Sequence, residues 1–182
     1  MSRLHEQLVA DHENLAAVLD VLEREIALYD QPEERERNPD LPLLHEIMDY
    51  IHDYPEAFHH PLEEAAFDYL QEQGLGDATA IQRIRTEHEE LDRQSSQTRE
   101  LLQAIESDQP VLLRKLQEQI GEFLKMQRQH MQHEEDTVFT AIRELDEQAC
   151  ETIRSRVHPR MDPLRANDAA QQFERLLSYL EG

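Results

Sequence analysis

Apolar residues recur along most of the chain at alternating spacings of three and four, which is the period of an amphipathic helix. In the first such segment the apolar stripe contains Leu8, Leu15, Leu19, Leu22 and Ile26. Four glycines, no tryptophan and a charged fraction of 32% are also typical of a helix-rich chain rather than a sheet. We therefore expect an all-α protein.

Prolines, glycines and capping residues divide this pattern into separate helices, with Asp40 and Asp77 as N-caps. Long helices are expected over about 3–29, 40–74, 77–107 and 110–145, with a polar connection over 33–39. Shorter helices are expected over about 147–157 and 167–180. This order predicts an up-down-up-down four-helix bundle over about 3–145 and a C-terminal helical extension over about 146–182, in one domain spanning 1–182.

Three histidines continue the apolar stripes of their helices. His12 falls between Leu8 and Leu15 without breaking the period, and His88 and His130 take equivalent stripe positions in the third and fourth long helices. A polar residue on an apolar stripe faces the interior of a bundle. These histidines are therefore predicted to point inward.

The second long helix contains two adjacent histidines whose orientation the pattern does not settle. Two nearby prolines each remove a backbone donor and should bend this helix, so its phase is uncertain. Residues four apart lie about one turn apart on one helix face. Either His59 with Glu63 or His60 with Glu64 can thus present an imidazole and a carboxylate together.

A second pair of this kind, His130 with Glu134, lies about seventy residues further on. At 1.5 Å per residue, His12 lies ~25 Å before the end of its helix and His59 ~27 Å after the start of the next. The corresponding distances are ~28 Å for His88 and ~30 Å for His130. In an antiparallel bundle these side chains share one level, which predicts a dinuclear metal site.

Residue types limit the kind of metal site. Cys150 is the single cysteine, so neither a disulfide nor a thiolate cluster can form within one chain. Imidazole and carboxylate ligands suit iron, manganese or zinc, and a carboxylate can bridge two cations while reducing their repulsion. A buried carboxylate without a partner would cost several kcal/mol or take up a proton. Two metal ions are the economical interpretation.

The formal net charge of −22, from 40 acidic and 18 basic residues, repels phosphate backbones and anionic lipids. Nucleic acid and membrane surfaces are therefore not expected as partners. The chain has no apolar run of the ~20 residues needed to span a bilayer and no apolar N-terminal signal, which predicts a cytoplasmic protein, monomeric or homodimeric. It also lacks a nucleophilic triad and a phosphate-binding glycine loop, so no catalytic turnover is assigned.

At the histidine-bearing segments the chain resembles the hemerythrin-like HHE cation-binding domain family. The resemblance covers about residues 1–145 and rests on segments 11–13, 54–64, 87–89 and 130–139. It implies a four-helix bundle holding two non-haem iron ions joined by an oxo or hydroxo bridge, with manganese or zinc as alternative metals. By the family's pattern, the metal ligands correspond to His12, His59, Glu63, His88, His130 and Glu134. The pair His60 and Glu64 is the competing register.

The chain departs from the oxygen carriers of that family. Those carriers have two histidines four residues apart on the third helix and an aspartate five residues after the last histidine, whereas here Asp92 follows His88 and two glutamates, Glu134 and Glu135, occupy the carboxylate position. One expected histidine is missing. His52 could replace it only if the helix kink shortens a separation of ~10 Å. The resulting open position favours redox chemistry, sensing or iron exchange over reversible oxygen transport.

Two classes of function remain open. The first is a di-iron protein that binds or senses oxygen, nitric oxide or peroxide, or exchanges iron. The alternative is an acidic helical interaction module with a structural metal such as zinc. A ferritin-like site is disfavoured because it needs Glu-x-x-His on two helices, and only Glu56 to His59 fits that spacing.

Overall fold

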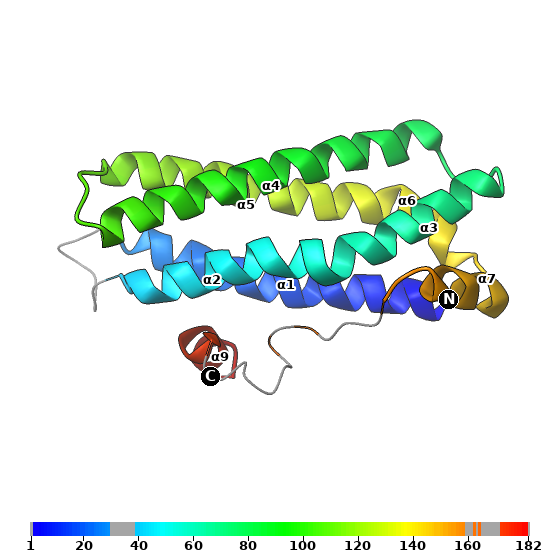
Figure 1. Cartoon of the computed structure of the whole chain (residues 1–182), viewed down its shortest axis with the longest axis horizontal. Helices are drawn as coiled ribbons and strands as arrows, with labels where there is room; N and C mark the ends of the chain where they lie inside the picture. Colours follow the sequence, from blue (N-terminus) through cyan, green and yellow to red (C-terminus); the bar gives the residue numbers. More distant parts are fainter. Residues whose placement is uncertain (1, 30–38, 159–161, 163, 165–171, 182) are drawn as a thin grey trace.

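The computed structural model describes residues 2–29, 39–158, 162, 164 and 172–181, in which helix is the regular secondary structure. The long helical segments are α1 (Arg3–Ala27), α2 (Leu41–Tyr54), η1 (Pro55–His59), α3 (His60–Glu72), α4 (Ala78–Glu106), α5 (Leu113–Asp136) and α6 (Val138–Arg143). Successive long helices run in opposite directions, and α1 contacts α2 and α5 while α4 contacts the same two helices (Figure 1). The predicted all-α, up-down-up-down four-helix bundle is confirmed.

Local interactions define the helix ends. The side chain of Asp40 accepts a hydrogen bond from the Leu43 amide, and that of Asp77 accepts one from the Thr79 amide, so both predicted N-caps are confirmed. Gly74 has a φ of +66°, which places the second residue after α3 in the left-handed region. Glycine adopts this conformation without strain, so the chain can turn there and enter α4.

The segment η1 (Pro55–His59) joins α2 to α3 as a π-helical turn within one helical run. The amide of His60 bonds to the carbonyl of Pro55, five residues earlier. Pro55 and Pro61 lack the amides that a regular α-helical ladder would use, which favours a local change of hydrogen-bond period here. The expected disturbance of this helix therefore takes the form of a π turn.

The buried apolar residues form two clusters, one toward each end of the bundle. One includes Leu15 and Leu91, and the other includes Leu8 and Ile84. Along α1 the boundary between them falls at His12, and along α4 it falls at His88. The inward-facing histidines thus lie in a polar layer between two apolar clusters.

Two further helices pack on the outside of the bundle (Figure 1). The helix α7 (Glu147–Ser155) contacts α3 and α1, and α9 (Glu174–Glu181) contacts α2 and α1. The predicted C-terminal helices are therefore present, although residues 167–171 of the last predicted helix and most of the predicted connection over 33–39 lie outside the described residues. Among the described helices, none is both long and apolar enough to cross a membrane.

Candidate metal centre

The polar layer contains two groups of potential metal ligands. The three-histidine group consists of His60, His88 and His130, and the mixed group consists of His12, His59, Glu63 and Glu134. Within each group the ligand atoms lie within 4.8 Å of one another. All these residues except His60, which is partly exposed, are buried. The layer therefore brings five imidazoles and two carboxylates together.

Glu63 lies between the two groups. Its Oε1 is 3.2 Å from Nε2 of His59, a member of the mixed group, and its Oε2 is 3.5 Å from Nε2 of His88, a member of the three-histidine group. The two oxygens of this carboxylate thus face different groups. This is the position from which a carboxylate can bridge two cations.

Glu134 is placed in a similar way from the opposite side of the bundle. Its Oε1 is 3.3 Å from Nε2 of His88, and its Oε2 is 3.1 Å from Nε2 of His12 and 3.3 Å from Nε2 of His130. This carboxylate also contacts both groups. Two carboxylates, contributed by α3 and α5, therefore connect the same two sets of imidazoles.

The carboxylates have few hydrogen bonds of their own. Within the described part of the chain, neither oxygen of Glu63 and not Oε2 of Glu134 receives a hydrogen bond of suitable geometry, although both side chains are fully buried. Burial raises the pKa of Glu134 well above its usual value, and the charge of Glu63 adds to this effect. Burial also opposes ionisation of Glu63, but the neighbouring His59, His88 and His60 together outweigh it and lower the pKa of Glu63. Buried carboxylate oxygens that lack hydrogen-bond partners fit a site in which cations bind to them.

The imidazoles are suited to metal binding because most of them favour the neutral form. Burial lowers the pKa of His12 to about 4 and that of His88 to about 3, and it also lowers the pKa of His130. Burial acts in the same direction on His59, but the carboxylates of Glu63 and Asp11 together outweigh it and raise the pKa of His59 to about 9. A neutral imidazole has a free lone pair for a metal ion.

Three outer carboxylates orient the imidazoles by accepting hydrogen bonds from their Nδ1 atoms. The pairs are His12 with Glu135 at 2.9 Å, His59 with Asp11 at 3.4 Å and His130 with Glu87 at 3.2 Å. Because Nδ1 donates to the carboxylate, Nε2 keeps its lone pair and faces the centre of the layer. This arrangement is typical of metal-ligating histidines.

Sequence reasoning assigned no role to Asp11 or Glu87 and considered Glu135 only at the family's carboxylate position, although each stands next to a predicted ligand. Asp11 precedes His12 but bonds to His59, and Glu87 precedes His88 but bonds to His130. Adjacent helical residues are turned by about 100° from each other, so the neighbour of an inward ligand points toward the next helix. Acidic residues beside ligand positions are the signal that could have identified them.

The structure brings together all six residues predicted as ligands, and it also resolves the register of the second helix. His59 contacts His12 on α1, whereas the ring of His60 stacks on that of His88 on α4, with centroids 3.8 Å apart. Glu64 lies outside the layer and pairs with Arg85. The two histidines are therefore not alternatives, because they join different groups.

This placement changes the interpretation that the centre lacks one histidine. His60 supplies a fifth imidazole. It lies on α3, whereas the family's oxygen carriers have the additional histidine on the helix that corresponds to α4. Neither of the other candidates is needed, because His52 and Asp92 lie 3.5 Å from each other and belong to neither group. With five imidazoles in the layer, the histidine count does not favour redox chemistry over oxygen transport.

Fold and site together define a helical bundle with a buried layer of histidines and carboxylates that could hold metal cations. The chain matches the family described as Hemerythrin HHE cation binding domain, in two overlapping matches over residues 3–142 and 79–182. It belongs to this family. Searches of curated proteins and of solved structures give no match for this chain.

Proposed function

We propose that this protein holds a non-haem di-iron centre and that it binds or senses oxygen, nitric oxide or peroxide, or exchanges iron. The observation that carries the proposal is the position of Glu63 and Glu134, each of which contacts imidazoles of both groups. A carboxylate that meets two sets of imidazoles suits a pair of cations better than a single one.

In this proposal the three-histidine group would hold one metal ion, and His12 and His59 would hold the other. Glu63 and Glu134 would be available to both. An iron pair would supply reversible one-electron oxidation at each metal and coordination positions for a small ligand. Manganese and zinc compete for the same nitrogen and oxygen donors.

The donor set disfavours a single structural zinc. Structural zinc sites are almost always tetrahedral and use four protein ligands. The layer contains five imidazoles and two carboxylates, and each of these seven side chains belongs to one or the other of the two groups. One tetrahedral ion would leave buried polar groups without a charge partner, at a cost of several kcal/mol for an ionised carboxylate.

Anaerobic purification, metal counting and visible spectroscopy test this proposal directly. We expect two iron ions per chain and an absorption band of an oxo-bridged pair that changes when oxygen is admitted. The same measurements after nitric oxide or peroxide addition would indicate the ligand class. A colourless protein with one zinc per chain would contradict the di-iron proposal.

His60→Ala is expected to lower the metal content to about one ion per chain. The substitution removes one of three imidazoles from the three-histidine group but leaves the mixed group complete. Metal analysis of the purified variant measures the effect. Glu64→Ala is the control and should retain two ions, because Glu64 lies four residues after His60 and pairs with Arg85 outside the layer. Full metal content in His60→Ala would argue against a role for this residue as a ligand.

Glu87→Ala is expected to weaken metal binding about 10- to 100-fold, as is usual when the carboxylate behind a metal-ligating histidine is lost. Glu87 accepts hydrogen bonds from Nδ1 of both His130 and His133. Competition with a chelator of known affinity measures the change. The exposed Glu89 provides the control variant Glu89→Ala, which should bind as the unmodified protein does. Equal affinities of the two variants would remove Glu87 from the site.

A further inference from the structure

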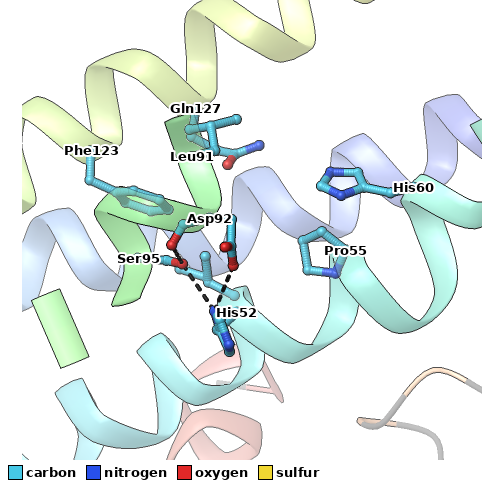
Figure 2. Close-up of a pocket in the computed structure, with 9 residues that line it drawn as sticks. His52, Pro55, His60, Leu91, Asp92, Ser95, Phe123 and Gln127 are labelled. Carbon is cyan, nitrogen blue, oxygen red and sulfur yellow. Dashed lines mark hydrogen bonds and ion pairs between the residues drawn. The ribbon is translucent and has the colours of Figure 1, made fainter. Parts of the chain in front are cut away.

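A small pocket lies beside the three-histidine group, between α2, α4 and α5 (Figure 2). His60 lines it on the side of the metal centre, and Leu91 and Phe123 contribute apolar surface. The space open to the centre of a water-sized molecule is about 10 Å³, roughly enough for one water. The pocket is therefore large enough for one very small ligand next to a proposed metal ligand.

The wall away from the metal centre consists of polar residues that reach toward solvent. Nδ1 of His52 lies 3.1 Å from the hydroxyl oxygen of Ser95, and this hydroxyl donates to the Asp92 carbonyl at 2.9 Å. Ser95 is buried, His52 is partly exposed and Asp92 is exposed. Polar groups thus continue from the surface to the pocket.

The remaining polar group is the side chain of Gln127, which enters the pocket from α5 opposite His52 (Figure 2). Gln127 is 5% exposed and lies three residues before His130. Within the part of the chain that the structure describes, no hydrogen bond joins its side-chain amide to the protein. The Gln127 amide faces the pocket, so it is available to hydrogen-bond a ligand there.

Charge restricts the kind of ligand. Asp92 lines the pocket, no lysine or arginine does, and the chain has a net charge of −22. This environment disfavours anions such as azide. A neutral molecule that can accept or donate a hydrogen bond fits both the charge and the volume.

We propose that this pocket is a binding site for one small uncharged molecule, of the size of water or a diatomic gas, and that such ligands reach the metal centre through it. Gln127 is the residue that hydrogen-bonds the ligand, and the group formed by His52, Ser95 and Asp92 is the entrance. The binding site is inferred from the pocket alone, whereas the access role rests on the proposed di-iron function.

Crystal structures of the metal-free protein test the binding site without reference to the metal. We expect an ordered water within hydrogen-bond distance of the Gln127 amide in the unmodified protein. In Gln127→Leu, a variant of similar size, this water should be lost. A Gln127 amide that pairs with the protein, or a pocket without any ordered molecule, would overturn the proposal.

Nitric oxide association with the ferrous protein, followed by stopped-flow absorbance, tests the access role. Ser95→Leu places a larger side chain at the pocket wall and should slow association at least tenfold, with the iron content unchanged. Ser96→Leu, the neighbouring position on α4 and not part of the pocket, should associate at the original rate and controls for the substitution.

Failure of the access role and failure of the di-iron function give different results. Equal association rates for Ser95→Leu and the unmodified protein, at full iron content, would overturn the access role alone. Absence of iron from the unmodified protein would overturn the di-iron function, and the crystallographic test of the pocket would still apply. If Ser95→Leu fails to fold, Gln127→Leu replaces it, with slower nitric oxide association as the supporting result and an unchanged rate as the opposing one.

Discussion

Protein with the substitution His130→Ala is expected to contain at most one metal ion per chain instead of two. His130 belongs to the three-histidine group, and its Nε2 also lies 3.3 Å from the shared carboxylate of Glu134. The substitution therefore removes a ligand and leaves a cavity in the polar layer. Metal analysis together with the visible spectrum of the purified variant measures the loss.

His133→Ala is the matched control for this experiment. His133 lies on the same helix, three residues further along, and bonds to Glu87 without belonging to either ligand group. It should retain two metal ions. Circular dichroism of both variants would show whether the helices remain formed. Equal metal losses in the two variants, at equal helix content, would refute the assignment of His130 as a ligand.

Removal of the metal by a chelator is expected to lower the melting temperature by about 5–10 °C. A ligand that binds only the folded state, at a free concentration of 100 times its dissociation constant, stabilises that state by about 2.7 kcal/mol. For a chain of this size, each kcal/mol corresponds to about 2–4 °C. Calorimetric melts of loaded and metal-free protein measure the difference. Equal melting temperatures would contradict metal binding in the folded layer.

The variant Glu134→Gln tests whether the metal that raises the melting temperature binds in the polar layer. Because burial raises the pKa of Glu134 well above its usual value, a neutral amide should cost little stability in the metal-free protein. In the loaded protein the same amide removes an anionic ligand, so the difference between the two melts should shrink. Glu118→Gln, on the exposed face of α5, should leave that difference unchanged. An undiminished difference in Glu134→Gln would exclude this carboxylate from metal binding.

Much of the bundle follows from local pattern. The apolar stripes predicted the long helices, and the caps at Asp40 and Asp77 predicted where two of them begin. His12, His88 and His130 were expected to face inward because they continue those stripes, and they are buried in the structure. These features could be read from the sequence because helix period and capping depend on residues within a few positions of each other.

The register of the second helix could not be predicted in this way. The prolines around η1 disturb the period, so the stripe does not say which of His59 and His60 points inward. In the structure both do, because adjacent helical residues differ by about 100° and this helix lies between α1 and α4. His59 meets His12 on one neighbour, and His60 meets His88 on the other.

The five-imidazole centre is likewise a property of the packed helices. Pairs such as His59 with Glu63 are local, since they lie one turn apart, and their spacing alone indicates a possible metal ligand. The contact of Glu63 with both groups depends instead on which helices are adjacent and on which of their residues lie at the same level along the bundle axis. Local periodicity therefore determines the helices and the inward-facing histidines. Tertiary packing decides which imidazoles share a group, because contacts between distant segments depend on helix order, orientation and level.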